Sequence, residues 1–287
     1  LIAGKNMADL QEKLETFLTF CKVKNIKLKT SKFVISTSVE FGGCLVSKED
    51  LGVFIEPKQN RIRAFEELKK PTTRKELQVY AGMCSSLQTW FPAIPMIIPE
   101  IRRACGSRST RRLEWNEIME EEYGRIKEVM KTQLKLSPYD EKKPLCLVID
   151  GTSTIGAGYV LFQWHNSQDP SQGASIISAN STMFPRARGF SPIDGELMAL
   201  VFACRSTGYW TSHCPDLHLF SDCSGLLQML KKHIVDVKNP LHRKLLCEIQ
   251  SFNFQSVRHI PGKSNKLTDA LSRLTRLVSR ANFDPLT

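Results

Sequence analysis

The sequence predicts an α/β fold, α+β overall, in which a mixed sheet with flanking helices follows a more helical first part. Three apolar segments typical of strands follow one another at about 144–150, 156–163 and 174–180, and helical and strand patterns alternate beyond them. A turn-rich stretch at 137–143 separates this region from the first half of the chain. The length of 287 residues allows two or three domains.

The first half begins with a predicted helix followed by strands. Asn6 and Asp9 form an N-cap and N3 pair. Apolar residues then recur at helical spacing, namely Met7, Leu10, Leu14, Phe17, Leu18 and Cys21. Strands are predicted at 33–35 and 39–46, and Gly42-Gly43 interrupts the second. Glycine inside a strand often marks a bulge or the close approach of another backbone.

Three helices are predicted between these strands and the linker. The first covers 57–69. Thr73 and Glu76 form a capping box for the second, whose apolar face holds Leu77, Tyr80, Ala81, Cys84 and Leu87. Residues 92–112, which contain three prolines and an arginine-rich stretch, are expected to be irregular. The third helix is expected from about 117 to 136.

The second half continues the alternation of helices and strands. Ser191-Pro192 opens a helix near 193–207, because Ser caps helices and Pro suits the first turn. The remaining predicted elements are a strand at 217–221, helices at about 223–232 and 240–250, a strand at 253–259 and a helix at 267–277.

Composition narrows the class of protein. The net charge is +11 and the pI about 9.3. Residues 1–140 hold 24 basic and 18 acidic groups and residues 141–287 hold 16 and 11, so both halves suit a long polyanion. Nine cysteines without a Cys-x-x-Cys pair indicate reduced thiols in an intracellular setting.

Neither the apolar runs nor the N-terminal residues predict insertion into a membrane. No apolar run reaches the ~18–20 residues of a bilayer span, and Leu1-Ile2-Ala3-Gly4 lacks the features of a signal peptide. The missing start Met indicates a processed product or a segment of a longer protein. We expect no membrane partner.

Four carboxylates stand in apolar surroundings. Asp150 and Asp222 end predicted strands, Glu196 falls in the first turn of a helix and Asp269 opens the last helix. Singly, each has a common explanation as a turn residue or a helix-start acid. Unpaired buried carboxylates are costly, however, and paired divalent cations would offset that cost. Together the four therefore indicate a two-metal site that hydrolyses a phosphodiester.

The four acids stand in the strings Leu147-Val148-Ile149-Asp150-Gly151-Thr152-Ser153, Phe190-Ser191-Pro192-Ile193-Asp194-Gly195-Glu196, Phe220-Ser221-Asp222 and the closing Ile260-Pro261-Gly262-Lys263-Ser264-Asn265-Lys266-Leu267-Thr268-Asp269-Ala270-Leu271-Ser272-Arg273. These strings resemble the ribonuclease H domain of gypsy-type LTR retrotransposon (Metaviridae-like) reverse transcriptases. The closing string is the most specific of them. The resemblance implies a ribonuclease H-like mixed sheet.

The resemblance extends upstream and implies a division of the chain. Glu40 to Ser47 resembles a primer-grip hairpin, Lys70 to Gly82 a thumb, and Leu113-Glu114-Trp115 the start of a connection helix. The implied parts are the end of a polymerase palm at 1–56, thumb-like helices at 57–92, a connection at 93–140, the ribonuclease H domain at 141–275 and a tail at 276–287.

The chain also departs from the family pattern. The polymerase Tyr-x-Asp-Asp motif is absent, so we expect no independent DNA synthesis from this segment. Gly42-Gly43-Cys44 stands where the family usually has Leu-Gly-His, and Cys223 follows the third acid where His is frequent. All four ribonuclease H acids are retained.

The implied activity is metal-dependent endonucleolytic hydrolysis of the RNA strand of RNA–DNA hybrids. Two Mg²⁺ ions, or Mn²⁺, would lie ~3.5–4 Å apart between Asp150, Glu196, Asp222 and Asp269, with Asp150 as the bridging ligand. The candidate nucleic-acid contacts are Gly42, Gly43, Gly151, Ser224, Arg258, Lys263, Asn265 and Lys266. The alternative for any single basic residue is a solvated basic face.

Two alternatives stay open at this point. One is that the chain is a non-catalytic architectural subunit or a domesticated nucleic-acid-binding remnant. The other is that it is part of a larger RNA-directed DNA polymerase, whose function would be reverse transcription. Expected partners are a primer-template or hybrid, and a second reverse transcriptase chain or the fingers and palm that the family places before such a segment. The expected location is cytoplasmic, in a virus-like particle or replication complex, or nuclear.

Overall fold

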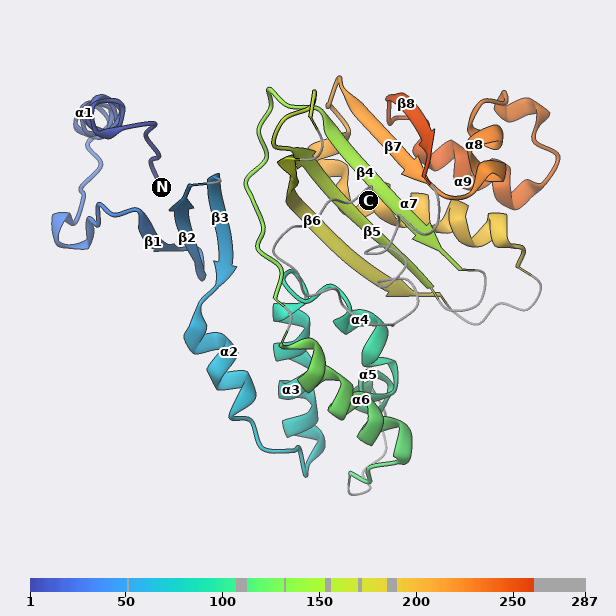
Figure 1. Ribbon diagram of the computed structural model, residues 1–287. Helices are drawn as coiled ribbons and strands as arrows, with labels where there is room; N and C mark the ends of the chain where they lie inside the picture. Colours follow the sequence, from blue (N-terminus) through green and yellow to red (C-terminus); the bar gives the residue numbers. More distant parts are fainter. Residues whose placement is uncertain are drawn as a thin grey trace.

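A computed structural model describes residues 1–50, 52–106, 113–131, 133–152, 156–169, 172–184 and 190–260. It is a mixed α/β structure with a small three-stranded sheet, a group of helices and a mixed five-stranded sheet (Figure 1). The predicted class is therefore confirmed. None of the helices in these ranges has the length and apolar character needed to cross a bilayer.

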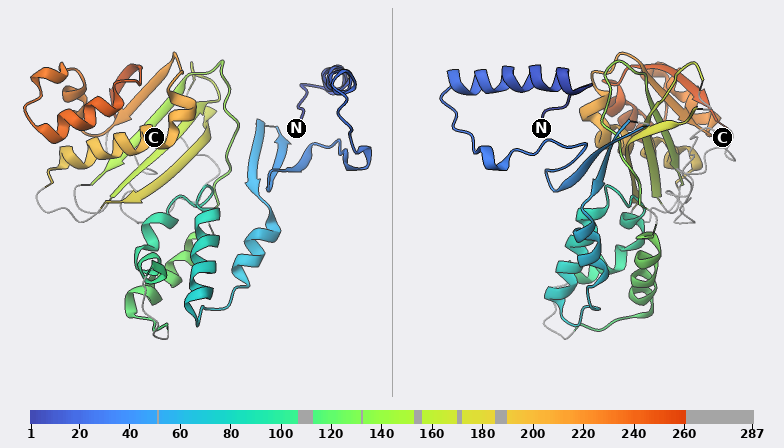
Figure 2. Two further views of the ribbon diagram at one scale, coloured as in Figure 1. Left: turned by 180° about the vertical axis from the view of Figure 1, so that it is seen from behind. Right: turned by 60° about the vertical axis from the view of Figure 1, so that its left-hand side comes forward.

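The N-terminal helix α1 (Met7–Val23) begins as the capping pair predicts, because the Asn6 side chain accepts a hydrogen bond from the Asp9 amide. In Figure 2 this helix extends away from the rest of the molecule. The strand predicted at 33–35 is wrong. A 3-10 turn, η1 (Thr30–Lys32), precedes these residues, no strand in the described part of the chain pairs with them, and their apolar side chains are exposed.

The small sheet is antiparallel, in the order β1 (Ser38–Phe41), β2 (Cys44–Glu49) and β3 (Gly52–Pro57). Gly42 and Gly43 form the two-residue turn between β1 and β2, with φ angles of 57° and 83°. Positive φ at both turn positions matches the twist of a tight hairpin and favours glycine. The two glycines thus form a turn that separates two strands, in place of a bulge within one strand.

A helical group follows, made of α2 (Gln59–Glu66), α3 (Arg74–Leu87), α4 (Ile94–Ile97), α5 (Pro99–Gly106) and α6 (Glu117–Val129). The capping box of Thr73 and Glu76 opens α3 as predicted, and every residue of its predicted apolar face is buried. The irregular stretch expected at 92–112 instead contains α4 and α5. Prolines lie in the first turn of both helices, where the missing amide hydrogen has no cost.

The larger sheet has the order β6-β5-β4-β7-β8. Its strands are β4 (Leu145–Gly151), β5 (Gly156–Trp164), β6 (Ala174–Met183), β7 (Leu217–Ser221) and β8 (Phe254–His259). The pairs among β4, β5 and β6 are antiparallel, whereas β4–β7 and β7–β8 are parallel. Parallel neighbours require crossover connections, and these are α7 (Pro192–Thr211) before β7, and α8 (Ser224–Leu230), η3 (Ile234–Asp236) and α9 (Pro240–Ile249) before β8. The helix predicted at 267–277 lies outside the described residues.

Each face of this sheet has its own core. On one face β-strand residues such as Leu147 and Leu219 pack with α7, α8 and α9. On the other face Val148, Phe162 and Phe220 belong to a cluster that continues through helices α2 to α6. The helical group and the sheet therefore share one hydrophobic core, which fixes the upstream helices against the sheet.

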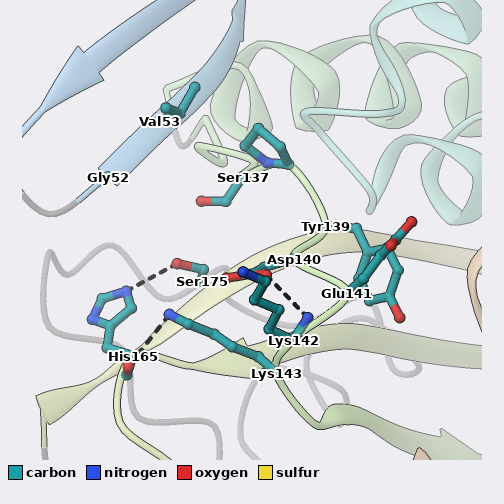
Figure 3. A pocket seen from close by; sticks show the side chains of 11 residues that line it. Gly52, Val53, Ser137, Tyr139, Asp140, Glu141, Lys142, Lys143, His165 and Ser175 are labelled. Atoms are coloured by element: carbon teal, nitrogen blue, oxygen red, sulfur yellow. Dashed lines mark hydrogen bonds between the residues drawn. The ribbon is translucent and has the colours of Figure 1, made fainter. Parts of the chain in front are cut away.

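The linker between the helical group and the sheet is held by a buried side chain of β5. The Gln163 amide donates to the Asp140 and Lys143 carbonyls at 2.8 and 2.9 Å and accepts from the Asp140 amide at 2.9 Å. Beside the linker, Val53 of β3 and Ser175 of β6 line opposite sides of a hollow of about 640 Å³ (Figure 3). The backbone also joins β3 to the linker, through the pairing of Ile55 with Leu136.

The hydrogen bonds of Glu122 in α6 lead to a testable prediction about the stability of the fold. Its two carboxylate oxygens accept hydrogen bonds from the Glu100 and Ile101 amides at 2.8 Å each, at the start of α5, and the side chain is buried. We expect Glu122→Ala to lower the free energy of unfolding by about 2 kcal/mol or more, because the buried Ile101 N–H and the part-buried Glu100 N–H lose their acceptor. Chemical denaturation with urea measures this change.

The neighbouring Glu121 is the matched control for that measurement. It is exposed on the same helix and pairs with Arg125 one turn on. Glu121→Ala should change the unfolding free energy by no more than about 0.5 kcal/mol. Equal losses in the two variants would contradict the assigned role of Glu122.

Candidate functional site

Three of the four predicted acids meet at one end of the five-stranded sheet. Asp150 is the penultimate residue of β4, Asp222 directly follows β7 and Glu196 lies in the second turn of α7. One carboxylate oxygen from each lies within 4.8 Å of the others. The parallel pairing of β4 and β7 brings their carboxyl ends to the same edge, and α7 begins there (Figure 1).

Glu196 is held between the ends of both strands. One of its carboxylate oxygens accepts from the Gly151 amide at 3.3 Å, and the other accepts from the Ser221 hydroxyl at 3.4 Å. The Ser221 hydroxyl oxygen in turn accepts from the Cys223 amide at 3.0 Å. The carboxylate of α7 is thus fixed to the two strand ends that carry the other acids.

Gly151 permits this close approach of strand and helix. A Cβ atom at Gly151 would lie 2.4 Å from the Gly195 carbonyl oxygen and 2.8 Å from Cβ of Ala199. Only glycine allows the end of β4 to pack this closely on α7. This packing gives Gly151 a structural role, and its contact with nucleic acid stays a prediction.

The electrostatics of the cluster suit a divalent cation. Asp150 and Glu196 are 2% and 6% exposed, and Asp222 is half-buried. Burial, followed by the charges of Asp150 and Asp222, raises the pKa of Glu196 to about 8. Three carboxyl oxygens this close repel one another when ionised, and a bound cation would remove both the repulsion and the desolvation cost. Oxygen ligands are those that Mg²⁺ and Mn²⁺ take in proteins.

The turn that carries Asp222 is fixed from β8 and from α8. A ring nitrogen of His259 lies 3.1 Å from the Asp222 carbonyl oxygen, to which it donates a hydrogen bond. The Cys223 sulfur accepts from the Leu226 amide at 3.4 Å and caps α8. Cys223 therefore serves the helix start at the position where the resemblance leads one to expect His.

The other predicted site residues are only partly brought together. Ser224 is exposed at the first position of α8, two residues after Asp222, and Arg258 is exposed on the outer strand β8. Gly42 and Gly43 lie in the β1–β2 turn of the other sheet, apart from the carboxylates. Lys263, Asn265, Lys266 and the fourth acid, Asp269, lie outside the described residues.

Three residues that contact or adjoin the site were not predicted from the sequence. Ser221 holds Glu196, while Asp194, two residues before Glu196, meets His242. The Ser191-x-x-Asp194 spacing is a capping-box signal that could have singled out Asp194. His242 gives no such signal, because 48 residues separate it from its partner.

Known proteins that resemble this chain include reverse transcriptases and transposon polyproteins. Residues 115–216 match the model of the RNase H-like domain found in reverse transcriptase. The Pol polyprotein of the transposon gypsy from Drosophila melanogaster is 22% identical over 284 residues, which is 95% of this chain and 26% of that protein. The Tf2-3 polyprotein of Schizosaccharomyces pombe is 24% identical over 276 residues, or 96% of this chain and 20% of its own length.

Solved structures show the same fold. The foamy viral protease-reverse transcriptase in complex with an RNA/DNA hybrid matches 96% of this chain and 36% of its own with a TM-score of 0.70 and 15% identity. The same enzyme with dsDNA matches 88% of this chain and 51% of its own, with a TM-score of 0.65 and 13% identity. This chain spans about a quarter or less of the two polyproteins. Residues 115–216 are therefore similar to the RNase H-like domain found in reverse transcriptase, and nearly the whole chain is similar to a part of the gypsy Pol polyprotein and of the Tf2-3 polyprotein.

Proposed function

We propose that this chain hydrolyses the RNA strand of RNA–DNA hybrids, as the ribonuclease H part of a retroelement reverse transcriptase. The observation that carries the proposal is the convergence of Asp150, Glu196 and Asp222 from three separate elements, with one oxygen of each within 4.8 Å. The foamy viral enzyme bound to an RNA/DNA hybrid supports this class of substrate. The basic net charge of +11 supports a polyanionic partner.

Divalent metal ions are the cofactor that these residues fit. Asp150, Glu196 and Asp222 would hold them, and the resemblance adds Asp269 as a fourth ligand. When bound, Mg²⁺ or Mn²⁺ supplies an activated water for attack on the phosphodiester and charge stabilisation for the leaving oxygen. Glu196 is kept in place for this role by the Gly151 amide and the Ser221 hydroxyl.

Substrate contacts are proposed for exposed groups around the cluster. The Ser224 hydroxyl, exposed and two residues from Asp222, would meet a 2′-hydroxyl, the group that distinguishes RNA from DNA. Arg258 on the outer strand would meet a phosphate. Contacts between basic side chains and phosphates weaken as the salt concentration rises.

Cleavage of a labelled hybrid tests the proposed function. In the presence of Mg²⁺ the chain should cut the RNA strand and leave the DNA strand intact. Asp222→Asn should lower the rate about 100-fold or more, because the amide keeps the shape of the side chain and removes a charge that would hold the metal. Denaturing gel electrophoresis separates the products.

Asp216→Asn is the matched control, since Asp216 precedes the opposite end of the same strand, β7. Its rate should stay within about twofold of the unaltered chain. Equal cleavage by the Asp222→Asn variant would refute the assignment of the site. Hybrid binding without any cleavage would instead support the architectural subunit.

Metal binding should release a proton, because Glu196 binds one in the metal-free protein. With a pKa of about 8 its carboxyl is mostly protonated at pH 7, and a metal ligand must be ionised. Isothermal titration calorimetry with Mg²⁺ in buffers of different ionisation enthalpy should detect close to one proton released at pH 7 and much less at pH 9. Metal affinity should rise with pH up to about 8.

The stability of the metal-free protein tests the same pKa independently. The pKa of Glu196 is raised in the folded state from 4.5 to about 8, so the folded state binds the extra proton. The contribution of this Glu196 proton to the free energy of unfolding is complete below pH 4.5 and is lost as the pH rises through about 8. Glu196→Gln should remove this loss and the proton release together. A native proton release of zero at pH 7 would contradict the raised pKa.

A further inference from the structure

The first turn of α7, which directly precedes Glu196, is held by two other helices. Asp194 in this turn is 6% exposed. One of its oxygens accepts from the Ser191 amide at 2.6 Å and from the Ser191 hydroxyl at 2.7 Å. Its other oxygen lies 2.5 Å from a ring nitrogen of His242 in α9. The Asp194 carboxylate thus caps its own helix and also ties it to α9.

The contact with α8 is tight as well. A Cβ atom at Gly225 would lie 2.9 Å from the Cδ1 atom of Ile193, in the same turn of α7. Gly225 is the second residue of α8 and follows Asp222 by three positions. The chain segment after the third acid therefore packs directly on the turn that leads to the second acid.

We propose that His242 is a positioning residue for Glu196. By its part-buried hydrogen bond to Asp194, His242 fixes the start of α7 against α9, and this sets how far the Glu196 carboxylate reaches toward Asp150 and Asp222. This role rests on the proposed function, since it assumes that the three acids bind metal. Residues that orient metal ligands typically change metal affinity or activity 10- to 100-fold when removed.

The location of His242 makes this role specific. Its side chain is 12% exposed, and its partner Asp194 stands two residues before Glu196. The protein has a second His–Asp pair, His218 with Asp216, at a distance of 2.9 Å. That pair lies at the start of β7, the opposite end from the acids, where it joins β7 to Ser256 of β8. A comparison of the two pairs separates positioning from general stability.

The test measures metal affinity in the full chain with His242→Phe, which fills the same space without a donor. Mn²⁺ binding is followed by electron paramagnetic resonance, and the half-saturating Mg²⁺ concentration is taken from hybrid cleavage. We expect the Mn²⁺ dissociation constant and the half-saturating Mg²⁺ concentration each to rise about tenfold. The cleavage rate at saturating Mg²⁺ should stay within about threefold of that of the unaltered chain. His242→Gln, which keeps a donor of similar reach, should restore most of the affinity. Should the Phe variant not fold, His242→Asn replaces it, because Asn is too short to reach Asp194.

His218→Phe is the matched control and should leave both metal constants within about twofold. Unchanged metal affinity in His242→Phe overturns the proposal, and so does an equal loss in both His variants. If the unaltered chain binds Mn²⁺ but cleaves no hybrid, the nuclease assignment fails, and weaker Mn²⁺ binding in His242→Phe still supports the positioning role. If the unaltered chain binds no more Mn²⁺ than its Glu196→Gln variant, both proposals fail.

Discussion

The parallel pairing of β4 with β7 is the constraint on which the site depends. It sets the carboxyl ends of the two strands side by side, so that Asp150 and Asp222 share one edge of the sheet. Parallel neighbours cannot be joined by a tight turn, and the connection from β4 to β7 passes through β5, β6 and then α7, which adds Glu196 at the same edge. Gly151 completes the arrangement, because any side chain there would collide with the Gly195 carbonyl. One topological feature therefore produces a cluster of acids from residues far apart in the sequence.

The same packing explains the electrostatic state of the cluster. Glu196 is buried by the close approach of helix and strands, and the two other carboxylates lie within a few ångströms of it. Burial and like charge act in the same direction on its pKa, whereas the hydrogen bonds from Gly151 and Ser221 act against them. At pH 7 the neutral form of Glu196 therefore predominates. An apolar residue at this position would stabilise the folded state better than a buried carboxyl group. An arrangement that disfavours its own ionised form in this way is well suited to a ligand of opposite charge.

Most of the fold could be predicted from local sequence patterns. The features that these patterns failed to predict depend on contacts between residues far apart in the sequence. The capping signals at Asn6, Thr73 and Ser191 each mark a helix start, and the predicted apolar face of α3 is buried. The segment 33–35 has the apolar character of a strand, but pairing partners decide whether a strand forms, and none is present in the described residues. In the site, the acids at strand and helix ends were predictable because the elements themselves were. The contact of His242 with Asp194 depends on how α9 packs on α7, which no spacing in the sequence encodes.

The core that joins the two halves of the chain extends this argument beyond the site. Val148 and Phe220 lie in the strands that carry Asp150 and Asp222, and both belong to the cluster that continues through helices α2 to α6. Leu147 and Leu219 of the same strands belong to the opposite cluster, with α7 to α9. Each of the two strands is thus fixed from both faces, and close-packed interiors transmit displacement with little slack. The upstream helices are consequently part of what fixes the two strand-borne acids, and α7 to α9 fix the third.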